Sequence, residues 1–125
     1  MNKQHNSTAL EDLSCLKDIL VSSESIQEIT KDISFEAFDS DMMRHLSTAR
    51  LFEIIGEATK KLSKELRKNY PHVPWKEMAG MRDILIHAYR NVDNQVIWSV
   101  AKKDIPGLAV NIQNIIGDVE KNTAK

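Results

Sequence analysis

Cysteine, proline and glycine are all scarce in this chain of 125 residues, which has one, three and four of them respectively. The single cysteine, Cys15, has no partner for an internal disulfide, so we expect it to pack as a small hydrophobic side chain. No apolar run approaches the roughly 20 residues that span a bilayer. The polar stretch from Met1 to Thr8 also lacks the apolar core of a signal peptide. The sequence therefore predicts a cytoplasmic protein with no membrane segment.

An excess of charge of one sign is also lacking, because 17 basic and 18 acidic residues give a formal net charge of −1. This balance does not by itself indicate a nucleic-acid-binding protein. One basic cluster nevertheless stands out, and it comprises Lys60, Lys61, Lys64, Arg67 and Lys68. Such a cluster is either a solvated helix end, where cations are favoured, or a patch that follows a phosphate backbone. Composition leaves both interpretations open.

The spacing of the apolar residues is helical throughout, and no stretch alternates as a strand would. The length fits one domain over residues 1–125, with flexible ends expected at 1–8 and 121–125. The predicted fold is therefore all-α, an up-and-down bundle of four to five helices.

Local signals place the first helix and the loop after it. Thr8 and Glu11 form a capping-box pattern, in which each side chain satisfies a backbone donor at a helix start. This pattern predicts a first helix over about 9–29. Phe35 and Phe38 are expected to hold the following loop against the core.

A long helix is predicted over about 41–63, with more apolar surface than one small core requires. Its core stripe is predicted to be Leu51, Ile54, Ile55, Ala58 and Leu62. Met42 and Leu46 lie outside that stripe, and Ala49 and Gly56 form a narrow strip where a second helix could approach closely. This excess of apolar surface favours a homodimer or another partner surface, and a closely packed monomer is the alternative.

Proline residues and helix caps divide the second half of the chain. After a proline-containing break, a short turn is predicted to end near Gly80, and the next helix covers 81–90. Asp93 can cap a further helix, and Asp104 with Pro106 just inside can start the last one. The apolar positions of that last helix are Leu108, Ile112, Ile115, Ile116 and Val119.

The helix predicted at 81–90 carries the residues suited to catalysis. On a wheel of 100° per residue, Arg82, Asp83, His87 and Tyr89 face away from the apolar side. Asp83 lies one turn before His87, where its carboxylate can hydrogen-bond the imidazole and set its tautomer. Arg82 and His87 are about 140° apart, so two such helices across a dimer axis would bring both pairs into one cleft. A charged surface helix is the simpler alternative, because an Arg-x4-His spacing is common by chance.

A string of local motifs also occurs in order along the chain. The motifs are Leu51-Phe-Glu-Ile-Ile-Gly-Glu-Ala58, Leu66, Tyr70-Pro71, Pro74-Trp75, Ala79-Gly-Met-Arg-Asp83, His87-Ala-Tyr89 and Val92-Asp93. Together they resemble the HepT family of the HEPN superfamily, from about Leu10 to Val119. Arg90 and Asn91 depart from the small or aromatic residues that are more usual after the motif tyrosine.

The resemblance implies an all-α homodimer with a metal-independent endoribonuclease site, in which Arg82 and His87 are catalytic. It implies no cofactor. It also implies the toxin role in a toxin–antitoxin pair, with a minimal nucleotidyltransferase as the antitoxin. In such pairs the antitoxin can transfer AMP to the motif tyrosine, which is Tyr89 in this sequence.

These residue types suit RNA cleavage, in which the 2′-hydroxyl attacks the adjacent phosphate. His87 titrates near neutral pH and can act as base or acid. Arg82 offers planar paired donors to a phosphate, and Asp83 would support His87 by orienting it. No divalent metal is required for this step.

Other interpretations stay open beside this one. Asp83 and His87 could ligate a metal, but two ligands make a weak site. Glu53 and Glu57 are either solvated ion-pair partners or part of a catalytic groove. For the whole chain, the alternative is a non-catalytic helical subunit that binds a nucleotidyltransferase partner. The two functions differ in whether His87 does chemistry, and the sequence does not name the RNA.

Overall fold

The computed structural model describes residues 2–83 and 93–123, and the side chains of 8–83 and 93–122. Across these ranges the chain is helical and contains no strand, which confirms the all-α prediction. The helices are α1 (Asn2–Thr30), α2 (Phe35–Ser40), α3 (Met42–Lys61), α4 (Lys64–Asn69), α5 (Trp75–Ala79), α7 (Asn94–Lys103) and α8 (Ile105–Thr123). The described part thus exceeds the predicted four to five helices. The prediction was wrong because α2, α4 and α5 are helices of five or six residues where no separate helix was expected.

The first helix starts earlier than its capping signal indicated. α1 begins at Asn2, so Thr8 lies inside the helix and not at its start. The prediction failed because residues 2–8 contain neither proline nor glycine, and nothing there interrupts a helix. The flexible ends at 1–8 and 121–125 remain a prediction.

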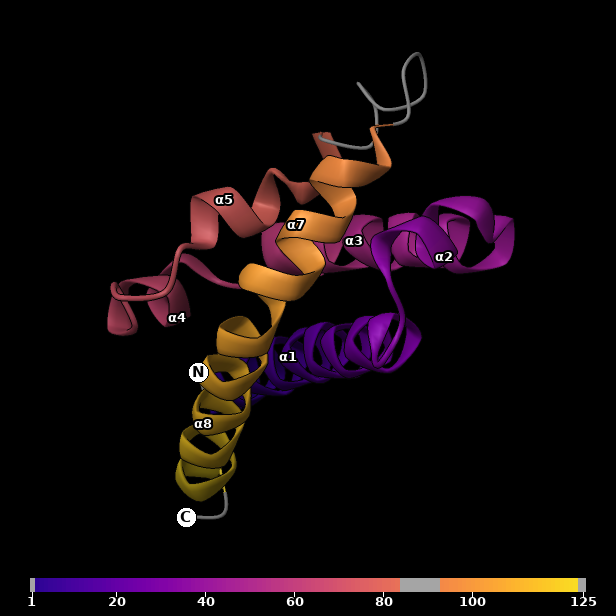
Figure 1. The fold of residues 1–125 in the computed structure, drawn as a ribbon. Helices are drawn as coiled ribbons and strands as arrows, with labels where there is room; N and C mark the ends of the chain where they lie inside the picture. The colour runs from indigo at the N-terminus through magenta and orange to yellow at the C-terminus, as the bar shows by residue number, and fades with distance from the viewer. Residues whose placement is uncertain (1, 84–92, 124–125) are drawn as a thin grey trace.

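The core lies between α1, α3 and the pair α7–α8. α1 and α3 run side by side, while α7 and α8 follow one another almost end to end across them (Figure 1). Side chains with no solvent exposure come from three of these helices, namely Leu16, Ile19 and Ile26 of α1, Ile55 of α3 and Ile112 of α8, and α7 contributes Ile97, which is 1% exposed. This arrangement buries one apolar face of every long helix in a shared interior.

The segment that was predicted as a loop held by two phenylalanines is the short helix α2. Ser34 caps it, because its Oγ accepts a hydrogen bond of 3.1 Å from the Ala37 amide. Phe38 is fully buried, and its ring centroid lies 5.1 Å from that of Trp98. Phe35 meets the same indole edge-on at 6.1 Å. The two phenylalanines therefore anchor this segment as predicted.

The buried face of α3 differs from the predicted stripe. Phe52 is fully buried although it lies outside that stripe, whereas Leu51 and Ile54 are half-buried. The other predicted members, Ile55, Ala58 and Leu62, are buried. The stripe was too narrow because α3 contacts α1 on one side and α5 on another.

The boundaries of the last two helices agree with the sequence signals. The Asp93 carboxylate accepts a hydrogen bond of 3.1 Å from the Gln95 amide and caps α7. Asp104 directly precedes α8, and its carbonyl accepts from the Leu108 amide at 3.1 Å. The predicted apolar positions of α8 face the core, with four buried and Val119 half-buried.

None of the helices in the described ranges combines the length and apolar character needed to cross a membrane.

Candidate functional site

The first part of the catalytic segment lies directly after α5. Met81 is 5% exposed, whereas Arg82 and Asp83 are exposed. Met81 therefore faces the core, and Arg82 and Asp83 face solvent, as the helical wheel predicted. His87 and Tyr89 lie outside the described residues, so their placement and the roles assigned to Arg82, Asp83, His87 and Tyr89 remain predictions.

The path into this segment is fixed by aromatic packing and backbone hydrogen bonds. Trp75 is buried at the start of α5, and its Nε1 donates to the Tyr70 carbonyl at 2.9 Å. The Gly80 amide donates to the Lys76 carbonyl at 3.0 Å, and the Asp83 amide donates to the Gly80 carbonyl at 2.9 Å. Gly80 itself has right-handed helical geometry. The chain thus passes from α5 to Asp83 in a nearly continuous helical course.

Gly56 of α3 lies directly against the backbone of Arg82. A Cβ placed on Gly56 would lie 2.9 Å from the Arg82 backbone nitrogen, 3.0 Å from the Arg82 Cβ and 3.1 Å from the Ala79 carbonyl oxygen. The prediction that a second helix approaches α3 at Gly56 is confirmed, but the approaching segment is 79–82 of the same chain. Gly56 is buried by this contact and does not belong to an exposed dimer surface.

The basic cluster occupies two helix ends. Lys60 and Lys61 are in the last turn of α3, and Arg67 and Lys68 are in the last turn of α4. The lysines are exposed, and Arg67 is half-buried with an Nε that makes no hydrogen bond to any residue the structure describes. These four positions agree with the helix-end interpretation, because cations near a helix C-terminus interact favourably with its dipole, whereas Lys64 is the first residue of α4. A role in binding phosphate remains a prediction.

The two glutamates of α3 have different surroundings. Glu53 pairs with Arg50 at 3.1 Å between Oε1 and Nη1, which confirms the ion-pair interpretation for this residue. Glu57 lines a cleft of about 520 Å³ between α1 and α3. The lining residues of this cleft are Glu11, Ser14, Cys15, Asp18, Ile54, Glu57, Ala58 and Lys61. They include neither Arg82 nor Asp83, and a place for Glu57 in a catalytic groove remains a prediction.

Cys15 lies in the same cleft and is a poor nucleophile there. Burial raises the pKa of its thiol, and the carboxylates of Asp18 and Asp12 raise the pKa further. The thiol is therefore largely protonated at neutral pH, whereas the thiolate is the reactive form. Within the described ranges, no group of three histidine, cysteine, aspartate or glutamate side chains is placed to hold a metal ion.

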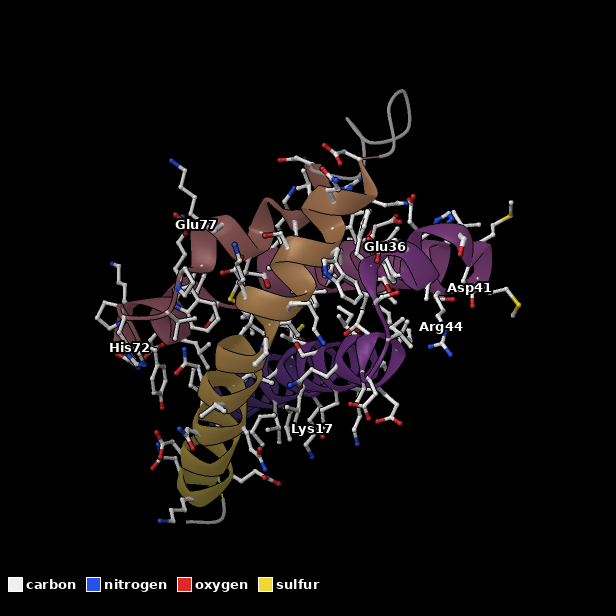
Figure 2. All side chains as sticks on the ribbon, viewed as in Figure 1. Lys17, Glu36, Asp41, Arg44, His72 and Glu77 are labelled. Atoms are coloured by element: carbon white, nitrogen blue, oxygen red, sulfur yellow. The ribbon has the colours of Figure 1, made fainter. Side chains whose placement is uncertain are left out.

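Exposed apolar side chains gather at the first turns of α3. Met42, Met43 and Leu46 are 67%, 80% and 54% exposed. Asp41 and Arg44 mark this end of α3 in Figure 2, whereas His72 and Glu77 lie on the α4–α5 side of the molecule. Gly56 is about 20 Å along α3 from Met42, at 1.5 Å per residue. The apolar end of α3 is therefore a separate surface from the contact at Arg82, and the homodimer remains a prediction.

One buried polar contact escaped the sequence analysis. Asp12 of α1 is 6% exposed, and its carboxylate accepts hydrogen bonds from the amide and the hydroxyl of Ser63. The available signal was the helical spacing of Asp12 with Leu16 and Ile19, which places a carboxylate on the buried face of α1.

Comparison with known proteins identifies relatives over most of the chain. The sequence model of the family described as "Ribonuclease HepT-like" matches residues 19–115. A Methanocaldococcus jannaschii protein named "Putative RNase MJ0125" is 43% identical over 106 residues, which cover 85% of this chain and 91% of that protein. A Thermococcus cleftensis protein named "Probable ribonuclease HepT" is 46% identical over 93 residues, covering 74% of this chain and 84% of the relative. No solved structure matches significantly.

Proposed function

Because the chain belongs to the HepT-like ribonuclease family, we propose that it is an endoribonuclease that cleaves RNA without a metal ion. Arg82 and His87 are its catalytic residues, and Asp83 supports His87. The HEPN-type family and the names of two relatives favour a ribonuclease over a non-catalytic subunit.

The observation that carries this proposal beyond family membership is the setting of Arg82. Its side chain is exposed, while its backbone lies against buried Gly56 and follows the buried Met81. A guanidinium on a fixed backbone can meet a phosphate with two parallel N–H donors. Such preorganised donors stabilise the charge that develops on phosphorus in the transition state.

The proposed reaction is an internal transfer at phosphorus. The 2′-oxygen forms a bond to phosphorus and loses its proton to a base, while the bond from phosphorus to the 5′-oxygen breaks and that oxygen receives a proton from an acid. The products are a 2′,3′-cyclic phosphate and a 5′-hydroxyl. Neutral His87 fits the base and protonated His87 fits the acid, so two histidines in a homodimer supply both groups.

We also propose the pairing that the family resemblance implies. The chain is the toxin of a toxin–antitoxin pair in the cytoplasm, and its partner is a minimal nucleotidyltransferase that transfers AMP to Tyr89. On the predicted helical wheel Tyr89 and Arg82 point in nearly the same direction, so an AMP group on Tyr89 is expected to bring a phosphate charge near Arg82 and to compete with RNA. Incubation with that partner and ATP should add the mass of AMP to the peptide containing Tyr89, and an unchanged mass would reject the modification.

The function is tested by incubating purified protein with RNA in EDTA. Cleavage should persist, and its products should carry cyclic phosphate and 5′-hydroxyl ends. His87→Ala should lower the rate by about 10² to 10⁴-fold, because it removes the general acid–base group. If the wild-type protein leaves RNA intact but still binds a nucleotidyltransferase, the non-catalytic subunit is the correct function.

A further inference from the structure

We infer that Gly56 is the positioning residue for Arg82: its missing side chain lets the backbone of Arg82 lie directly against α3, which sets where the guanidinium meets substrate phosphate. The inference rests on the proposed function of Arg82. The inference gives Gly56, a buried glycine of α3, a role in the site that contains Arg82.

The contact leaves no room for a side chain at Gly56. Two of the three atoms that a Cβ would meet are the Arg82 backbone nitrogen at 2.9 Å and the Arg82 Cβ at 3.0 Å. A real Cβ essentially never lies as close as 2.9 Å to another heavy atom, and 3.0 Å is tighter than nine in ten real Cβ contacts, so a methyl group here would force a displacement. Neither atom is the far end of a flexible side chain. The displacement must therefore move the Arg82 backbone or move α3.

Burial on the two sides decides which element moves. On α3, Phe52 and Ile55 are fully buried, and the Thr59 hydroxyl donates to the Ile55 carbonyl at 2.7 Å. A shift of α3 would disturb this core, and close-packed interiors resist such shifts. Arg82 and Asp83 are exposed, and within residues 79–83 only Met81 is buried. The segment carrying Arg82 is the element that would yield.

A small backbone shift is enough to impair catalysis. The described part of the structure fixes Arg82 through its backbone, which lies against Gly56 and follows the buried Met81. Catalytic groups must be held within about 0.5 Å of their productive geometry. A misplacement of about 1 Å can lower a rate by 10²-fold. Gly56 therefore controls the rate although it lies too deep to contact RNA.

The other helical glycines provide matched controls. Gly107 and Gly117 lie in α8, and a Cβ on either would meet nothing within 4 Å. All three positions are helical, where alanine is intrinsically preferred over glycine. The same substitution should therefore be tolerated or stabilising at Gly107 and Gly117. At Gly56 the intrinsic helical preference for alanine is opposed by the collision of the added Cβ with the Arg82 backbone.

The test is Gly56→Ala built into a Gly107→Ala/Gly117→Ala background, which adds helix stability. Cleavage is measured at a temperature where circular dichroism shows the protein fully folded. We expect kcat to fall about 10²-fold, KM to change by less than about 3-fold and the pH–rate profile to keep its shape. The Arg82 amide resonance should shift in NMR spectra, while amides in α1 and α8 stay in place. The background alone should keep wild-type kcat.

A double-mutant cycle separates positioning from a general structural role. In an Arg82→Lys background, Gly56→Ala should cost much less than 10²-fold, because the group it positions is already replaced. Equal losses in both backgrounds would overturn the inference, as would an unshifted Arg82 amide or failure of the stabilised variant to fold. If Arg82→Lys and Arg82→Ala retain full activity, the proposed function fails instead, whatever Gly56→Ala does.

Discussion

Asp12 of α1 accepts two hydrogen bonds from Ser63, one of 2.8 Å from the backbone amide and one of 2.6 Å from the hydroxyl. The same hydroxyl oxygen accepts from the Leu66 amide at 3.2 Å and so caps α4. One buried carboxylate therefore ties the first helix to the junction of α3 and α4.

Removal of this carboxylate should destabilise the protein. Asp12→Ala leaves a partly buried amide and hydroxyl without their acceptor, and we expect the free energy of unfolding to fall by about 2–3 kcal/mol. Asp18→Ala, at an exposed position on the same helix, should change it by no more than about 0.5 kcal/mol. Urea denaturation measures both. Equal effects of the two substitutions would contradict the role given to Asp12.

Tyr70 should make stability fall at high pH. Burial raises the pKa of its hydroxyl above the ordinary value of 10, and its hydrogen bond of 3.1 Å with the Asp118 carboxylate raises the pKa further. The folded state therefore holds this proton more tightly than the unfolded state does. The resulting stability is fully present below pH 10 and is lost as pH rises through the folded-state pKa.

The pH dependence is measured from urea midpoints between pH 9 and pH 11.5. In a Tyr89→Phe background Tyr70 is the only tyrosine, so its ionisation can be followed by absorbance. Asp118→Asn should bring the pKa of Tyr70 closer to 10. In the Tyr89→Phe protein with Asp118 intact, a Tyr70 pKa of 10 or lower would show that the contact with Asp118 does not persist in solution.

Cys15 should react slowly with thiol reagents. Because burial and then Asp18 raise the pKa of its thiol, its thiolate fraction at pH 7.5 is below that of the unfolded chain. Reaction with Ellman's reagent should be several-fold slower in buffer than in urea, and Asp18→Asn should accelerate the reaction of the folded protein. Asp104→Asn, at a position that does not affect the thiol, serves as the control. A folded-state rate equal to the unfolded rate would refute this description of Cys15.

How far the sequence predicted the fold depended on whether the deciding contact was local. Asp93 caps α7 as expected, because its partner is the amide of Gln95 two residues away. The buried positions of α8 also followed from spacing, since Ile112, Ile115 and Ile116 share one side of the helix.

Contacts between distant segments were predicted incompletely. The sequence indicated that a helix could approach Gly56, but it did not show that the approaching segment was 79–82 of the same chain. Phe52 was missed for the same reason, because α3 has neighbours on two sides. The candidate site was predicted mainly through family resemblance. Helical geometry contributed the outward direction of Arg82 and Asp83, which the structure confirms.

The homodimer prediction concerns the exposed apolar end of α3. Burial of Met42, Met43 and Leu46 against a second copy would remove apolar surface from water. Leu46→Glu should therefore shift the protein from two chains to one in sedimentation at micromolar concentration. Val110→Glu, on an exposed position of α8, should leave the dimer intact. A wild-type protein that sediments as a single chain would rule out the composite site.

The central claim is that Arg82 stabilises the transition state of RNA cleavage, and its most direct measurement is kcat/KM for Arg82→Ala beside Arg50→Ala. Arg50 is an exposed arginine of α3 that pairs with Glu53, so its removal deletes the same charge from a different surface. We predict a loss of at least about 10²-fold for Arg82→Ala, as for removal of a preorganised transition-state donor. For Arg50→Ala we predict less than about 3-fold, the size of a surface ion-pair effect. Equal kcat/KM values for the two variants would contradict the account.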